Sequence, residues 1–325
     1  MLCADVSKSL KISVYLMLLM CVITVTSCMK ETTYGSIVAR IEFESAYTQM
    51  AILPNGEYVY VNNFTTRIRV LSTSSNQIVD SLQIPDNGAD YVAVDPSGQY
   101  VYATGSYEIS IIETANNTVV DAIPMLGAQG IVVEPSAEHA YVSCGYDSGK
   151  VKVVRLADRT IIDSINVGTC PMKMSILPNG EFLYVLNYYG SSISVIRLSD
   201  RQVIATIETA DYQPYDIAAL PNNEYMYVTN GIDDVYVIRT SDNIVVDTIA
   251  GSHLGCRGIA ASPEGEYVYV CNFGDRSVSI IRVSDNVVIG SIDVIDRPLE
   301  VVVHPGGDYL YVGNGAVTVI ELSVN

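Results

Sequence analysis

The sequence predicts an all-β protein made of seven four-stranded sheets, and three observations support this prediction. A proline-led segment recurs at intervals of 39 to 43 residues, beginning at Pro54, Pro96, Pro135, Pro178, Pro221, Pro263 and Pro305. Each repeat contains four short runs rich in Val, Ile and Tyr and bounded by Gly, Pro, Asn or Asp, which is the pattern of strands and turns. The last repeat supplies only three such runs, and a matching fourth run lies near the other end of the chain.

The fifth repeat illustrates the four expected strands, which are "YDIAAL" (215–220), "YMYVTN" (225–230), "DVYVIRT" (234–240) and "IVVDTI" (244–249). The first two are joined by Pro-Asn-Asn, in which proline presets φ and asparagine tolerates positive φ. The last two are joined by Ser-Asp-Asn, which uses the same turn chemistry. Four strands in a unit of about 40 residues, repeated radially, are typical of a β-propeller. The sequence therefore predicts seven blades.

The two ends of the chain are expected to close the ring. The run "SIVARIEF" (36–43) aligns with the fourth strands of the other repeats, and the last repeat ends in "AVTVIELSVN" (316–325). Pairing the first run into the last blade removes the exposed sheet edges that invite aggregation. Residues 36–325 are therefore expected to form one propeller.

The first 27 residues have the layout of a signal peptide. Lys8 and Lys11 precede an apolar run of 15 residues (12–26), shorter than the about 20 residues needed to span a membrane. The run ends in "VTSC", which resembles a lipobox with Cys28 as the lipidated residue, and 28–35 would then be a lipidated cysteine and tether. Met29 rather than Asp follows the cysteine, and by analogy with the sorting rule of lipoproteins this favours the outer membrane, on the cell surface or the periplasmic face. An ordinary signal peptide with an incidental cysteine is the alternative.

The tetrapeptide Tyr227-Val228-Thr229-Asn230 and its near-copies carry a family resemblance. The sequence resembles the YVTN-repeat (surface-layer-type) seven-bladed β-propeller lipoprotein family over nearly all of the chain after the signal segment. This resemblance implies the fold but gives little evidence of function, because propellers host many unrelated activities. We expect the motif to be scaffold, with its tyrosines packed between blades and its asparagine holding the turn after the second strand.

Charge and cysteines limit the partners. The formal net charge of −18 disfavours nucleic-acid binding, which needs basic patches.

In an exported protein, an even number of cysteines suggests disulfides, and the candidate pairs are Cys256 with Cys271 and Cys144 with Cys170. No C-x-x-C spacing is present among them, so no metal site is expected.

A ligand site is expected on the face formed by the loops between second and third strands and the links between blades, around the channel. Residues that depart from the repeat gather in these segments. The expected ligand-binding set is Tyr47, Tyr107, Tyr146, Tyr188, Tyr189, Tyr212, Tyr215, His253, Arg257, Phe273 and Arg297. Tyrosines with two arginines suit the stacking of a flat ligand and hydrogen bonding to its edges. The alternative is that these rings only cap the blade ends.

Catalysis has little support in the sequence. There are three histidines, and no Ser-His-Asp arrangement, G-x-S-x-G elbow or metal-binding spacing. No catalytic residue, metal or cofactor is therefore expected, and the sequence favours a protein that is not an enzyme.

The favoured function is a surface-anchored binding lipoprotein that captures a small nutrient or a partner protein beside an outer-membrane transporter. Some lipidated propellers of gut bacteria that look similar capture corrinoids, so the resemblance implies a corrinoid as one candidate. The alternatives are a structural or adhesive surface-layer-type scaffold and, less favoured, a lactonase- or lyase-type enzyme. A lactonase or lyase would need carboxylate or histidine side chains converging within about 5 Å of one point on the channel axis. A monomer is expected.

Overall fold

The computed structural model describes residues 34–43, 49–62, 65–85, 88–145, 149–209, 213–250 and 255–323. The chain divides into two units, Met1–Tyr34 and Gly35–Asn325, and the second unit holds the fold. The expected lipidation site, Cys28, lies outside the described residues. Within them, no helix has the length and apolar character needed to cross a bilayer.

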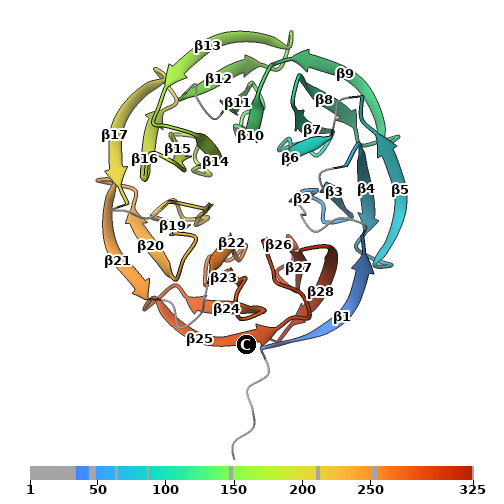
Figure 1. The fold of residues 1–325 in the computed structure, drawn as a ribbon, viewed down its shortest axis with the longest axis vertical. Helices are drawn as coiled ribbons and strands as arrows, with labels where there is room; N and C mark the ends of the chain where they lie inside the picture. Colours follow the sequence, from blue (N-terminus) through green and yellow to red (C-terminus); the bar gives the residue numbers. More distant parts are fainter. Residues whose placement is uncertain are drawn as a thin grey trace, which may run out of the picture. The chain divides into compact units, whose positions relative to one another are not determined.

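The second unit is a seven-bladed β-propeller, as the repeats predict (Figure 1). Its first four sheets, from the innermost strand outward, are β2 (Gln49–Ile52), β3 (Tyr58–Asn62), β4 (Arg67–Ser72), β5 (Gln77–Gln83); β6 (Ala89–Val94), β7 (Tyr100–Gly105), β8 (Glu108–Glu113), β9 (Thr118–Pro124); β10 (Ala128–Val133), β11 (His139–Cys144), β12 (Lys150–Arg155), β13 (Thr160–Asn166); and β14 (Pro171–Ile176), β15 (Phe182–Asn187), β16 (Ser192–Arg197), β17 (Gln202–Glu208). The other three are β18 (Asp216–Ala219), β19 (Tyr225–Thr229), β20 (Asp234–Arg239), β21 (Ile244–Ala250); β22 (Cys256–Ala261), β23 (Tyr267–Asn272), β24 (Ser277–Arg282), β25 (Val287–Asp293); and β26 (Glu300–Val303), β27 (Tyr309–Gly313), β28 (Ala316–Leu322), β1 (Gly35–Glu42).

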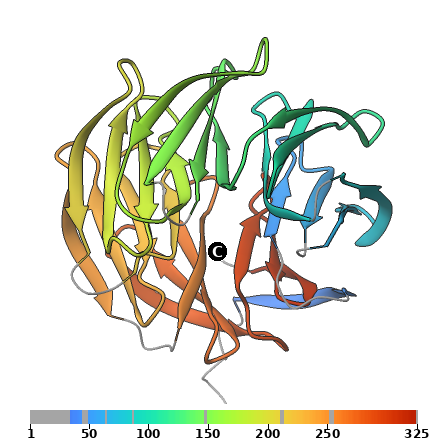
Figure 2. The ribbon, with the colours of Figure 1, turned by 45° about the horizontal axis from the view of Figure 1, so that its top comes forward.

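The predicted ring closure is confirmed. β1 pairs antiparallel with β28, with Ser36 opposite Glu321 and Glu42 opposite Ala316. In Figure 2 the blue β1 lies along the red strands of the last blade, and the blades show the twist expected of short antiparallel sheets. The first described strand therefore completes the last blade.

The repeated tyrosines of the second strands are packed between blades, as expected. Six of them are less than 2% exposed, namely Tyr60, Tyr141, Tyr184, Tyr227, Tyr269 and Tyr311. The hydroxyl of Tyr227 donates to Oδ1 of Asn286 in the next blade at 2.6 Å, and Tyr184 donates to Asn243 at the same distance. Both asparagines have positive φ, near 57°, in the turn between third and fourth strands. Asparagine at this position thus adopts the backbone conformation that the turn needs and also accepts a hydrogen bond from the neighbouring blade.

The asparagine at the end of the second strand holds the following turn, also as expected. Oδ1 of Asn230 accepts backbone N–H groups from Ile232, Asp233 and Asp234 at 3.0 to 3.1 Å. In another blade, Nδ2 of Asn187 donates to the hydroxyl of Ser194 at 2.9 Å. The YVTN-like motif is therefore scaffold.

The two predicted disulfides are not formed, and all four cysteines are buried thiols. Cys256 lies opposite Asn272 in the β22–β23 ladder, so its side chain shares the face of Asn272, and Cys271 points to the other face. Sγ of Cys144 lies 3.8 Å from Sδ of Met125, in the core shared with the preceding blade. Cys144 therefore faces away from the blade that Cys170 enters. The prediction failed because it considered only how close the cysteines are to the strand ends. It did not consider to which face of the sheet each side chain points.

Candidate functional site

The innermost strands bring one position of each repeat to the channel. This position lies five residues before the turn proline, and its occupants are Gln49, Tyr91, Gly130, Lys173, Asp216, Gly258 and Glu300. Six of the seven, all but Gly258, line the cavities described below, and at both glycines the neighbouring blade comes close to the backbone. A Cβ on Gly258 would lie 2.7 Å from Cα of Glu300, and one on Gly130 would run into the carbonyl oxygen of Met172. The channel position therefore holds either a polar side chain or a glycine that lets neighbouring inner strands pack closely.

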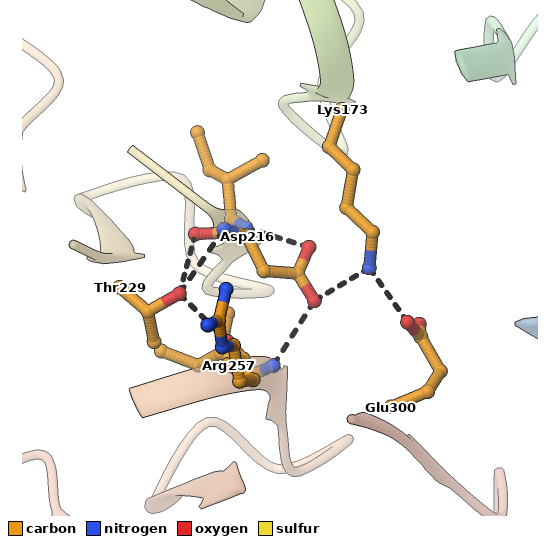
Figure 3. Close-up of polar contacts among 7 residues, drawn as sticks. Lys173, Asp216, Thr229, Arg257 and Glu300 are labelled. Carbon is orange, nitrogen blue, oxygen red and sulfur yellow. Dashed lines mark hydrogen bonds and ion pairs between the residues drawn. The ribbon is translucent and has the colours of Figure 1, made fainter. Parts of the chain in front are cut away.

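Three members of this set form a buried ion-pair cluster (Figure 3). Nζ of Lys173 lies 2.7 Å from Oδ2 of Asp216 and 2.7 Å from Oε2 of Glu300. Their side chains are 12%, 7% and 10% exposed, respectively. Asp216 also accepts backbone N–H groups, from Ile217 at 2.8 Å and from Ile259 of the next blade at 3.1 Å. One lysine therefore joins blades four, five and seven across the channel.

The cluster sets the charge state of its members. Burial by itself would lower the pKa of Lys173, but Asp216 and Glu300 together raise this pKa above its ordinary value, so the amine stays a cation. Burial raises the pKa of Glu300 to about 7, with Lys173 opposing the shift and Asp216 adding to it. Burial also raises the pKa of the nearby Tyr91 hydroxyl. Lys173 is thus a fixed positive charge, whereas Glu300 titrates near neutral pH.

Two cavities meet at this cluster. One, of about 240 Å³, is lined by Gln49, Tyr91, Met172, Lys173, Tyr188, Tyr189 and Tyr215. The other, of about 350 Å³, shares Gln49, Tyr91 and Lys173 and continues along the inner strands past Asp216 and Glu300. The smaller cavity carries the tyrosines of the predicted ligand face. We call it the tyrosine cavity.

Three predicted residues line the tyrosine cavity and touch one another. The rings of Tyr188 and Tyr189 meet edge to face at 5.2 Å between centroids, and Tyr188 meets Tyr215 at 6.4 Å. Tyr189 is 58% exposed, so its ring is accessible to a ligand. Tyr188 and Tyr189 follow β15, and Tyr215 directly precedes β18, so these three tyrosines come from two neighbouring blades.

Three further predicted residues extend this wall through cation–π contacts. The guanidinium carbon of Arg257 lies 4.3 Å from the ring centroid of Tyr215 and 5.7 Å from that of Phe273. The guanidinium carbon of Arg297 lies 5.3 Å from the ring centroid of Phe273. Arg257 belongs to a bulged segment of β22, where the register shifts between Cys256 and Ile259. Bulges re-aim side chains, and this one places an arginine between two rings.

The rest of the predicted set is not brought to this site. Tyr107 is 60% exposed and lines neither cavity at the channel. Tyr47, Tyr146, Tyr212 and His253 lie outside the described residues.

Sequence reasoning missed Lys173, Asp216 and Glu300. Aligning the repeats on their prolines would have found them, because charged residues interrupt an otherwise apolar inner strand at one fixed offset. The convergence of two carboxylates at one point of the channel is the geometry that a lactonase or lyase was expected to need.

A larger hollow of about 880 Å³ lies between blades three and four, beside the turn prolines. Glu134, Glu138 and His139 there have ligand atoms within 4.8 Å of one another. However, Nδ1 of His139 lies 2.7 Å from Glu134, and the guanidinium of Arg201 lies 3.4 Å from its Nε2. Both ring nitrogens of His139 therefore have a partner, and the Arg201 cation lies beside the group. These residues are explained as an ion network between blades rather than as a metal site.

Comparison with known proteins shows the fold and little else. No protein-family model matches the chain, and no curated protein matches it. Among solved structures, a chain of "Kuenenia stuttgartiensis Hydrazine Synthase" is similar with a TM-score of 0.78 and 18% identity, covering 91% of this chain and 99% of that chain. At this identity the likeness shows the fold alone.

This comparison corrects the expectation that the chain is not an enzyme. A structure named for an enzyme shares the fold over nearly the whole chain, so the fold gives no ground for excluding catalysis. The likeness assigns no reaction to this chain. The structure shows a seven-bladed propeller, a fold that serves in general as a scaffold for ligand binding or protein interaction.

Proposed function

We propose that this chain is a binding lipoprotein of the YVTN-repeat type, held at the outer membrane through Cys28, that captures a small flat ligand in the tyrosine cavity. The observation that carries the proposal is the cavity itself. Tyr188, Tyr189 and Tyr215 form a continuous aromatic wall at the mouth of the channel, and Lys173 lies at its base. Aromatic walls with a few polar groups are the usual composition of small-molecule sites.

The size of the cavity limits the ligand. Its 240 Å³ is below the about 300–1,000 Å³ typical of pockets that enclose drug-sized ligands. A small planar molecule would fit inside, whereas a corrinoid would rest on the loop face with one edge in the cavity. In the cell, the captured ligand would pass to an outer-membrane transporter or another surface protein.

A thermal-shift screen tests this function. The panel holds corrinoids, haem, quinones, oligosaccharides, small aromatic acids and divalent metals, and a ligand at 100 times its dissociation constant stabilises by about 2.7 kcal/mol. A hit should be lost in Tyr189→Ala. Tyr107→Ala is the matched control, because Tyr107 has nearly the same exposure, 60% against 58%, but does not line the cavity. Equal loss in both variants would argue against capture at the cavity.

Anchoring is tested separately. Metabolic labelling with an alkyne fatty acid should mark the wild-type protein and leave Cys28→Ser unlabelled. A labelled Cys28→Ser protein, or an unlabelled wild type, would contradict the lipoprotein assignment.

A second candidate is a hydrolase or lyase, and Glu300 favours it. A carboxyl group with a pKa of about 7 in a channel cavity matches the requirement for a general base or acid at neutral pH. In lactone hydrolysis, Glu300 would take a proton from the attacking water and return it to the ring oxygen that leaves. Glu300→Gln should then abolish lactonase activity, and the exposed Glu138→Gln should not. Equal activity in both variants would remove this candidate.

A further alternative is a structural or adhesive protein that binds a macromolecule through its outer strands. They expose apolar side chains, including Val79 at 53%, Val120 at 45% and Ile244 at 45%. An adhesive protein would keep its function in Tyr189→Ala and lose it when Val79 and Ile244 are changed to Lys.

A further inference from the structure

Arg257 has a buried donor whose acceptor is not among the residues that the structure describes. Its Nε atom is buried and makes no hydrogen bond to any residue that the structure describes. Leaving a buried donor unsatisfied is costly, and more so when the group is charged. Such a group beside a cavity is a candidate contact for a bound molecule.

Arg257 and Arg297 differ from other arginines of the chain in their partners. Arg155, Arg197, Arg239 and Arg282 each form an ion pair with an aspartate three residues later, at 2.5 to 2.6 Å. Across residues 34–323, excluding the undescribed segments, neither Arg257 nor Arg297 forms an ion pair with a carboxylate. The chain has 36 acidic residues against 18 basic ones, so carboxylates are abundant. Both arginines lie over the ring of Phe273, and neither has a carboxylate partner among the residues that the structure describes.

The stacking of Arg257 keeps its hydrogen-bonding edge available. The guanidinium carbon of Arg257 lies 4.3 Å from the ring centroid of Tyr215 and 5.7 Å from that of Phe273. An arginine stacked on an aromatic ring donates from its edge, in the plane of the group. That planar fork matches a carboxylate or phosphate with two parallel hydrogen bonds. Stacking also fixes the side chain in advance, which reduces the entropy lost on binding.

The arginines continue the aromatic wall of the tyrosine cavity. Contacts run from Tyr189 through Tyr188 and Tyr215 to Arg257, and from there through Phe273 to Arg297. A planar molecule stacked on Tyr188 and Tyr189 could therefore carry an acidic group on the side of Tyr215 and Arg257. The base of the cavity adds the cation of Lys173, although its charge is balanced by Asp216 and Glu300.

We propose that the ligand of this site is a small aromatic carboxylic acid, with its ring stacked on the tyrosine wall and its carboxylate bound by Arg257. This inference rests on the proposed function and adds a ligand class and a specificity residue to it. An acidic protein that selects an anion needs a local arrangement to overcome its own field, and Arg257 with Arg297 provides one.

The experiment compares two probes of the same shape, 2-naphthoate and 2-naphthamide, by calorimetric titration. The expected result is that the wild-type protein binds the acid at least about tenfold more tightly, which corresponds to 1.4 kcal/mol. Arg257→Gln should reduce this ratio to near one, and Arg297→Gln should reduce it in part. Arg239→Gln is the control, because Arg239 is paired with Asp242 away from the cavity and its loss should leave the ratio unchanged.

The outcomes separate this inference from the proposed function. If acid and amide bind equally and Tyr189→Ala weakens both, small flat ligands are captured but anion selection is refuted. If neither binds at about 10 mM, the aromatic-acid ligand class is overturned, and the thermal-shift panel decides the proposed function separately. If Arg257→Gln does not fold, Arg257→Lys keeps the charge without the planar fork and should still lose most of the selectivity. Undiminished selectivity in Arg257→Lys would refute the bidentate contact.

Discussion

The Lys173 cluster gives the sharpest test of how this propeller is held together. Lys173→Met removes a cation that lies 2.7 Å from two carboxylates and is 12% exposed. Breaking a buried ion pair by removing one partner costs about 3–5 kcal/mol, because the remaining charge is left without compensation. Native domains have only about 5–15 kcal/mol of stability, so the loss should be large.

Urea unfolding of the purified protein measures this loss. With a slope of about 1–3 kcal/mol per molar urea, the midpoint should fall by about 1–2 M or more at pH 8. Lys150→Met is the matched control, because Lys150 is an exposed strand lysine and its replacement should cost less than about 0.5 kcal/mol. In the double variant Lys173→Met/Glu300→Gln, part of the stability should return, since Asp216 keeps its two backbone N–H donors.

The pH dependence supplies the decisive comparison. The pKa of Glu300 in the folded protein, about 7, lies above its ordinary value, so its protonation stabilises the fold fully below pH 4 and this contribution is lost as the pH rises through 7. Removing Lys173 takes away the charge that opposed this shift. The penalty of Lys173→Met should therefore be larger at pH 8 than at pH 5. A penalty below about 1 kcal/mol at pH 8, or one that is equal at both pH values, would refute the reasoning.

Three other predictions concern the scaffold. Tyr227→Phe removes the hydrogen bond to Asn286 and should cost about 1 kcal/mol in urea unfolding, and an unchanged midpoint would show that this inter-blade bond is dispensable. Gly130→Ala places a Cβ against the carbonyl oxygen of Met172 and should cost several kcal/mol; a variant with the wild-type midpoint would show that the inner strands separate easily. All four described cysteines are buried thiols, so dithiothreitol should leave the unfolding midpoint unchanged and a thiol reagent should label the native protein slowly; rapid labelling would show that these sites open.

The channel cluster was hidden from sequence reasoning because its members are far apart in the chain. Lys173 is 43 residues from Asp216 and 127 from Glu300, and only the closed ring brings them together. Their shared offset from the turn prolines is visible in the sequence. The distances across the channel decide which residues at that offset form pairs. They also decide the burial that raises the pKa of Glu300 to about 7.

The sequence by itself determined the seven blades, the scaffold role of the Tyr and Asn positions, and ring closure by the strand after Tyr34. These features follow from local turn chemistry and from a side-chain period that repeats in every unit. The tertiary structure alone decided that Tyr188, Tyr189 and Tyr215 share a cavity while Tyr107 does not. It also decided which faces the cysteines occupy, because bulges and register set side-chain direction and leave little trace in composition.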